Sequence, residues 1–239
     1  MINTMKTLTK KIFITMVMAC LTIGSVCGQT EVEFINDTDI PTEELKEAST
    51  RVLDKVNDLV HYLGMMTCGS CGYSDNTKLD ICTDALSLFM GNGDPYPVSV
   101  QIIRGKDTIW EKQTAPAVAM QFIKSKWTPD SVITRLTKEY LNSLIHDPFA
   151  KKKHVKIGLA KAARIDNVNK TSDGHYVAIV TIKLRTIRLN QSESRIIYQD
   201  DTEKKVQVYM QRVETTTAMG TKMVQWIIKL GDIYAVKVE

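Results

Sequence analysis

Residues 176–184 read YVAIVTIKL, and apolar side chains occupy every second position of this run. Because a β-strand turns alternate side chains to opposite faces, the run predicts a strand with one buried face. That face is expected to carry Tyr176, Ala178, Val180, Ile182 and Leu184.

The same alternation, rich in β-branched and aromatic residues, recurs along the chain after Lys153. It predicts four strands, at 154–168, 174–189, 195–213 and 222–238. The inward faces of the last two are expected to carry Val206, Val208 and Met210, and Trp226, Ile228 and Leu230. Since the connections between these long strands are short, an antiparallel meander is favoured.

Apolar residues spaced by three or four positions predict helices ahead of this sheet, at 41–66, 78–90 and 129–146. Residues 97–112 favour a short hairpin, and 115–125 fit either a strand or a helix. The predicted fold class is α+β, with N-terminal helices packed on a curved antiparallel four-stranded meander. Because no repeat or long linker interrupts the chain, one domain is expected over 29–239.

This order of elements resembles the cone-shaped fold of the nuclear-transport-factor-like and cystatin-like superfamily. The resemblance covers roughly 41–238, and the ending VQWIIKLGDI at 224–233 looks like the last strand of that fold. It implies a sheet that wraps around the helices and often leaves a cavity. Such a fold hosts enzymes, binding proteins and inert modules alike, so the resemblance implies no particular function.

The first 28 residues read as an export signal. Lys6, Lys10 and Lys11 form a positive start, and residues 12–26 are uncharged and largely apolar. This apolar run is shorter than the ~20 residues that a membrane-spanning helix needs. The segment therefore predicts export of the protein, and no transmembrane segment is expected in the mature chain.

Signal cleavage is expected between Gly28 and Gln29, because short side chains precede that bond. Two alternatives stay open. Lipidation of Cys20 would make the protein an outer-membrane lipoprotein with a lipid anchor, and an uncleaved segment would itself be the anchor.

The composition excludes several classes of protein. With 44% hydrophobic residues and only 12 Gly and 6 Pro among 239, the chain is neither disordered nor collagen-like. Its formal net charge of +4 shrinks on cleavage, because the three lost lysines leave 28 basic and 27 acidic residues. This near-neutral balance argues against a nucleic-acid partner.

The charge is unevenly distributed along the mature chain. Residues 29–150 carry 18 acidic and 11 basic side chains, whereas 151–239 carry 9 acidic and 17 basic ones. Either the two halves pack together through complementary surfaces, or a basic face meets an anionic partner.

The most specific local motif is Cys68-Gly69-Ser70-Cys71, followed by Cys82. An oxidising exported environment favours a disulfide that staples the first two helices, but which two cysteines pair stays open. A redox-active pair usually follows a strand and opens a helix, whereas this motif comes after the end of a long helix. A zinc site would need a fourth ligand, and free thiols are the remaining alternative.

No catalytic motif is legible, since the histidines at 61, 146, 154 and 175 lie in separate segments and none belongs to a nucleophile elbow or a zinc motif. We therefore expect an exported, non-catalytic binding or assembly module of the bacterial cell envelope, in the periplasm or at the cell surface. It is expected to use no cofactor or metal and to meet an envelope protein or a small ligand. The alternatives are an enzyme with its active site in the cavity between sheet and helices, and a thiol oxidoreductase that uses Cys68 and Cys71.

Overall fold

The computed structural model describes residues 42–69, 71–104, 107–125, 128–146, 155–171, 174–190, 192, 194–216 and 220–236. These residues all belong to one compact unit. The expected signal peptide, the Cys20 lipidation site and the Gly28–Gln29 cleavage site lie outside the described residues. In the described part of the chain, no helix combines the length and apolarity needed to span a bilayer.

The described helices are α2 (Thr42–Thr67), α3 (Asp75–Ser87), the 3-10 turn η1 (Met90–Gly93) and α4 (Thr137–His146). The predicted apolar stripe on α2 is confirmed, since its members are at most 2% exposed: Leu45, Ala48, Val52, Val56, Leu59 and Leu63. Helix α3 begins before the predicted position 78, because the Ser74 hydroxyl caps it by accepting a hydrogen bond from the Thr77 backbone N–H at 3.1 Å.

Two sheets accompany these helices. The smaller consists of β1 (Tyr96–Arg104) and β2 (Asp107–Ala115), paired antiparallel. The larger contains β3 (Ala119–Ser125), β4 (Thr128–Leu136), β5 (Val155–Lys170), β6 (Tyr176–Leu189), β7 (Ile196–Thr216) and β8 (Lys222–Ala235). Its strand order is β4-β3-β8-β7-β6-β5, and β3 runs parallel to β8. The protein is therefore an α+β protein with a mixed sheet.

The four strands predicted after residue 153 are present as β5 to β8, and each pairs antiparallel with the next. The sheet is larger than the four strands expected, because β3 and β4 extend it beyond β8. Residues 115–125 fitted either a helix or a strand by sequence. In the structure, residues 119–125 form β3, because the edge of β8 offers a backbone pairing partner to a strand at that place.

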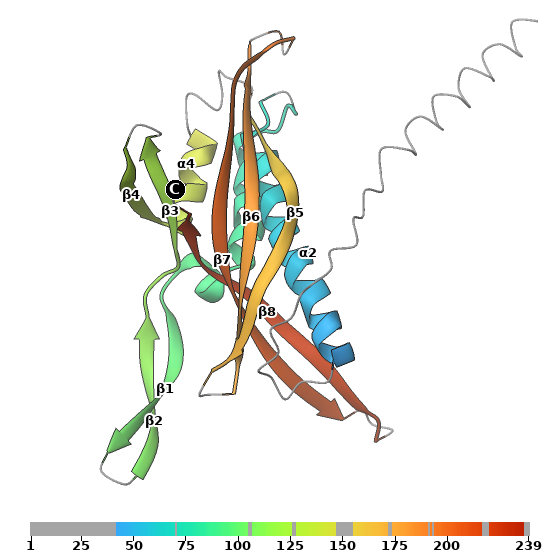
Figure 1. Ribbon diagram of the computed structural model, residues 1–239, viewed down its shortest axis with the longest axis vertical. Coiled ribbons are helices and arrows are strands. Elements are labelled where there is room, and N and C mark those ends of the chain that lie inside the picture. Colours follow the sequence, from blue (N-terminus) through green and yellow to red (C-terminus); the bar gives the residue numbers. More distant parts are fainter. Residues whose placement is uncertain are drawn as a thin grey trace, which may run out of the picture. The chain divides into compact units, whose positions relative to one another are not determined.

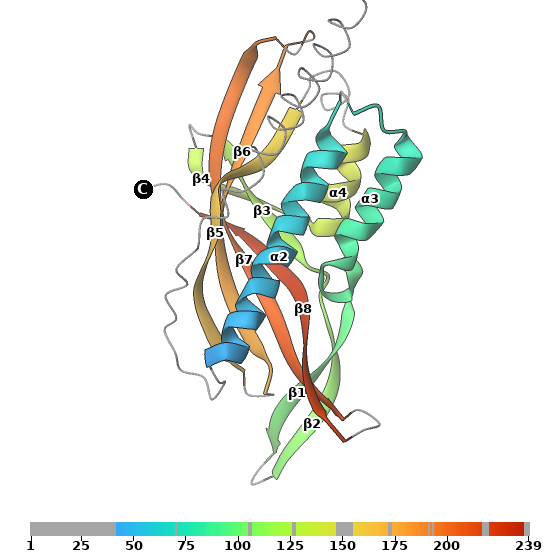
Figure 2. The same cartoon turned by 90° about the vertical axis from the view of Figure 1, so that its right-hand side faces the viewer.

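The larger sheet bends around α2. The pairing of β5 with β6 shifts register at three places, between Leu159 and Lys161, between Lys161 and Arg164, and between Ile165 and Asn167. Such bulges bend a strand and increase its twist. Figure 2 shows the consequence, with α2, α3 and α4 side by side on one side of the strands.

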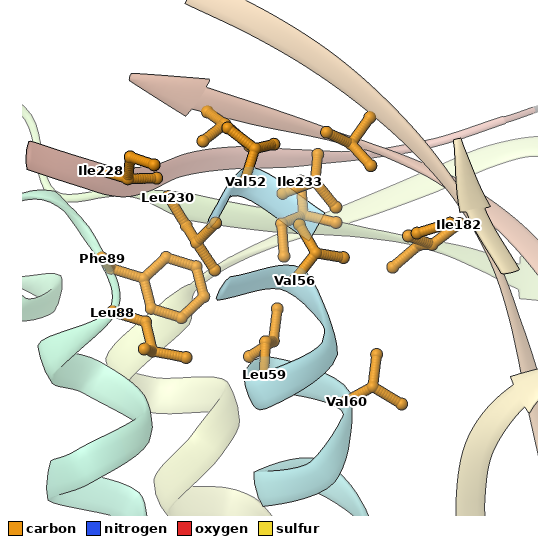
Figure 3. Close-up of a cluster of buried hydrophobic side chains, with 14 of the residues drawn as sticks. Val52, Val56, Leu59, Val60, Leu88, Phe89, Ile182, Ile228, Leu230 and Ile233 are labelled. Atoms are coloured by element: carbon orange, nitrogen blue, oxygen red, sulfur yellow. The ribbon is translucent and has the colours of Figure 1, made fainter. Parts of the chain in front are cut away.

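The core forms where α2 meets this sheet and the segment after α3. Figure 3 shows Val52, Val56 and Leu59 of α2 facing Leu230 and Phe89. Phe89 is fully buried, and the neighbouring Leu88 carbonyl accepts a hydrogen bond from the Leu230 backbone N–H at 2.8 Å. This backbone link holds the end of α3 against β8.

The predicted helix at 129–146 is wrong in its first half. Residues 128–136 form β4, which pairs with β3 through Val132 opposite Ile123 and Ile133 opposite Phe122. Val132 and Leu136, expected on the buried helix face, are 36% and 42% exposed. Their four-residue spacing imitated a helix, but β-branched residues and the edge of β3 favour a strand. The helix α4 begins only at Thr137.

The predicted hairpin at 97–112 is confirmed and is longer than expected, since β1 and β2 pair from Tyr96 opposite Ala115 to Arg104 opposite Asp107. It follows the turn at η1, where Gly91, Asn92 and Gly93 all have positive φ. Glycine adopts that conformation without steric cost, so the turn ends the helical segment and redirects the chain. Figure 1 shows β1 and β2 running away from the larger sheet.

Candidate functional site

A pocket of ≈ 660 Å³ lies between the larger sheet and the helices, in the volume range of small-molecule sites. Its walls come from α2, α4, β3, β5, β6, β7 and the end of β8. Most of the wall is apolar, and it includes Leu63, Met120, Phe122, Ile123, Ile157 and Leu184.

Strand β7 supplies all of the charged side chains that line this pocket. Asp200, Thr202 and Lys204 are alternate residues, so they share the face that continues into the buried Val206. Burial increases along this row, because Asp200 and Thr202 are half-buried whereas Lys204 is 6% exposed. Asp200 therefore marks the outer end of the row, which we call the mouth, and Lys204 marks its base, about 13 Å along the strand.

The Lys204 ammonium group is held at the base by β3. Its Nζ donates a hydrogen bond to the Gln121 carbonyl oxygen at 2.6 Å and lies 4.4 Å from the centroid of the Phe122 ring. Among the described residues no other group accepts a hydrogen bond from it, so two of its three protons lack a protein acceptor there. Burial lowers the pKa of Lys204 to about 8, because desolvation disfavours the charged amine.

Two aromatic residues continue the wall beside this amine. The rings of Phe122 from β3 and Tyr140 from α4 have centroids 4.5 Å apart, with an interplanar angle of 40°. Burial raises the pKa of Tyr140 to about 12, so its hydroxyl stays protonated and neutral at physiological pH. The base of the pocket thus combines one cation with an aromatic wall.

The mouth is more polar. The Tyr198 hydroxyl donates a hydrogen bond to Asp200 Oδ2 at 3.1 Å, and the Arg188 guanidinium carbon lies 5.2 Å from the centroid of the Tyr198 ring. The next residue, Asp201, accepts hydrogen bonds from Arg185 at 2.8 and 2.9 Å. The adjacent carboxylates of Asp200 and Asp201 therefore accept these hydrogen bonds from different donors, Tyr198 and Arg185.

The structure links Cys68 to Cys71, with their Cα atoms 5.6 Å apart. The expected staple between the first two helices is not formed, because this disulfide closes only the short segment after α2. Cys82 is free and buried on α3, with its Sγ 3.6 Å from Asn142 Oδ1. Burial raises the pKa of the Cys82 thiol, which keeps it protonated.

The other residues considered from the sequence do not converge. His61 and His146 are exposed, on α2 and at the end of α4, while His175 is half-buried just before β6. His154 lies outside the described residues. Where the structure describes the chain, no three His, Cys, Asp or Glu side chains lie close enough to hold a metal ion.

Sequence reasoning missed Lys204. The one available signal was its place in the alternation of β7, where position 204 falls on the inward face that carries Val206, Val208 and Met210. A lysine at such a position is rarely buried unless it is paired. The pocket around it could not be found, because Gln121, Phe122 and Tyr140 come from segments that the chain places far from β7 in sequence.

Comparison of the chain with protein-family models, with curated proteins and with solved structures found no match. The geometry of the pocket therefore carries the functional argument.

Proposed function

We propose that this protein is an exported binding module of the bacterial cell envelope that holds a small, largely apolar ligand in the pocket between sheet and helices. The observation that carries the proposal is the pocket itself, which offers ≈ 660 Å³ behind a largely apolar wall whose charged groups all come from β7. Small-molecule sites have this composition, because apolar area supplies affinity and a few placed polar groups orient the ligand.

The proposed kinship with the nuclear-transport-factor-like and cystatin-like superfamily belongs to the same proposal. Two features support it: a bent run of antiparallel strands, β5 to β8, packs against the long helix α2, and a cavity remains between sheet and helices. The kinship adds no function of its own, since folds of this kind carry many activities.

Binding rather than catalysis is proposed because the titratable groups of the pocket do not form a reacting pair. Lys204 and Tyr140 both contact the Phe122 ring, yet no hydrogen bond joins them. A thiol oxidoreductase is disfavoured, because Cys68 follows the C-terminus of α2, where the negative end of the helix dipole opposes a thiolate.

The binding experiment uses Nile red, a neutral dye whose fluorescence rises in apolar surroundings. Wild-type protein is expected to bind it saturably. Ala235 lines the pocket, so Ala235→Phe should fill part of the space and weaken binding at least about tenfold. Ala162→Phe is the matched control, because Ala162 is exposed on β5 and does not line the pocket.

Near-ultraviolet circular dichroism verifies that both variants remain folded. Absence of saturable binding by the wild type contradicts the proposal, as does equal binding by Ala235→Phe and Ala162→Phe.

Export is tested separately by the intact mass of the protein recovered from the cell envelope. A mature N-terminus at Gln29 is the expected result. A lipid on Cys20 would instead establish the lipoprotein alternative, and a mass that retains the first 28 residues would contradict cleavage.

A further inference from the structure

The ligand class can be narrowed from the charge at the base of the pocket. Lys204 is 6% exposed, and among the described residues its ammonium group has one hydrogen-bond acceptor, the Gln121 carbonyl oxygen. A buried ammonium group in apolar surroundings is costly unless it is paired with an anion. In the part of the chain that the structure describes, no carboxylate forms an ion pair with Lys204, so a ligand that carries one negative charge would compensate this ammonium group.

Three carboxylate residues line the pocket, Asp200, Asp201 and Glu203, and none of them forms an ion pair with Lys204 among the described residues. Glu203 precedes Lys204 on β7, so its side chain is exposed on the opposite face of the strand. Asp201 accepts two hydrogen bonds from Arg185, and Asp200 accepts one from Tyr198 at the mouth. Four residues of extended strand separate Asp200 from Lys204, a distance of about 13 Å along β7. Direct pairing of Asp200 with the ammonium group would require a contact of about 4 Å.

The rest of the pocket defines the other part of the ligand. Leu184 lies opposite Thr202 in the pairing of β6 with β7, between Asp200 and Lys204, and Leu63 and Ile157 also line the pocket. The aromatic side of the base, Phe122, already contacts the ammonium group. A ligand that fits this arrangement carries its charge at one end and an apolar body along the remainder.

We propose that the pocket binds an amphiphile with a single terminal carboxylate, which pairs with the Lys204 ammonium group while its apolar chain lies against Leu63, Ile157 and Leu184. This inference rests on the proposed function, because it names the ligand class of the same pocket. One ammonium group neutralises one charge, so a monoanion is matched. A phosphate monoester carries about −1.5 to −2 at pH 7 and would bury charge that nothing on this wall neutralises.

The test compares dodecanoate, dodecan-1-ol and dodecyl phosphate, which share one chain and differ in their head group. Dodecanoate and dodecyl phosphate are titrated below their micelle concentrations by isothermal calorimetry, and dodecan-1-ol is titrated below its solubility limit. Wild-type protein is expected to bind dodecanoate at least about tenfold more tightly than the alcohol, and more tightly than the phosphate.

Lys204→Met should remove this preference by weakening dodecanoate at least about tenfold, while the affinity for dodecan-1-ol changes less than about threefold. Lys205→Met is the matched control. Lys205 is the next residue on β7, is exposed on the opposite face and does not line the pocket, so this variant should keep the wild-type preference.

The outcomes separate the two proposals. If none of the three amphiphiles binds while Nile red binds saturably, the inference fails and the pocket function stands; if Nile red also fails to bind, both fail. If the alcohol binds as tightly as the acid, or if Lys204→Met keeps the preference, the pocket function stands and the carboxylate assignment is overturned. Tighter binding of dodecyl phosphate than of dodecanoate overturns the assignment of a monoanion.

Discussion

Replacing Lys204 with methionine is expected to stabilise the empty protein at neutral pH. Burial lowers the pKa of this amine from 10.5 to about 8, a difference that corresponds to about 3 kcal/mol of stability lost when both states are charged. Methionine has a similar length and no charge. The substitution also leaves the Gln121 carbonyl oxygen without its partner, which costs about 1–2 kcal/mol. The expected net gain is therefore about 1–2 kcal/mol at pH 7.

The stability gained through Lys204→Met should shrink as the pH rises, and proton linkage gives the sign of this pH dependence. Between pH 8 and 10.5 the folded protein has released the Lys204 proton while the unfolded chain still holds it. Because the unfolded state binds more protons there, the stability of the wild type rises with pH across this window. The penalty on the wild type falls from about 3 kcal/mol at pH 7 to about 1 kcal/mol at pH 10. Lys204→Met lacks this group and does not share the recovery.

Urea denaturation of the wild type, Lys204→Met and Lys205→Met at pH 7 and pH 10 measures the effect. The exposed Lys205→Met control should stay within about 0.5 kcal/mol of the wild type at pH 7. A Lys204→Met protein that is less stable than the wild type at pH 7, or a difference that does not change with pH, would refute the view that an uncompensated cation is buried in the pocket. The expected result would show that Lys204 destabilises the empty protein. Binding sites often keep such residues at a cost in stability.

Three further predictions concern the rest of the fold. Replacing both Cys68 and Cys71 with serine should lower the free energy of unfolding by no more than about 2 kcal/mol, measured in urea, because the disulfide closes a very short loop. A larger loss would mean that the disulfide constrains more than this segment. Gly231→Ala should cost about 1–3 kcal/mol, since its new Cβ would lie 2.6 Å from the Tyr209 ring. The cost should be smaller in a Tyr209→Ala background, and an unchanged cost in that double-mutant cycle would reject the steric explanation. Phe89→Ala should cost about 3–5 kcal/mol in the same urea assay, given that Phe89 is fully buried, and a loss below about 1 kcal/mol would show that the ring is loosely packed.

The elements with strong periodicity could be predicted from the sequence. The inward face of β6 was expected from alternation, and Tyr176, Ala178, Val180, Ile182 and Leu184 are all buried. Helix α2 followed from its apolar spacing and acidic start in the same way. In both cases one element carries the whole pattern, so local sequence suffices.

Prediction from the sequence failed where contact with a distant segment of the chain determines the local structure. Residues 128–136 carry apolar spacing that fits a helix, but pairing with β3 makes them a strand. The pairing of Cys68 with Cys71 was likewise open, because three cysteines allow several disulfides and only the positions of α2 and α3 leave Cys82 apart.

The sequence by itself determined the class of the protein: an α+β chain, with a long amphipathic helix and four long strands whose buried faces can be read residue by residue. It also carried the expectation of export in its first 28 residues. Only the tertiary structure decided that β3 and β4 extend the sheet, and that Lys204 meets Gln121 and Phe122 beside a pocket. The physical reason is that periodicity records which face of an element is buried, whereas a binding site depends on which distant elements enclose that face.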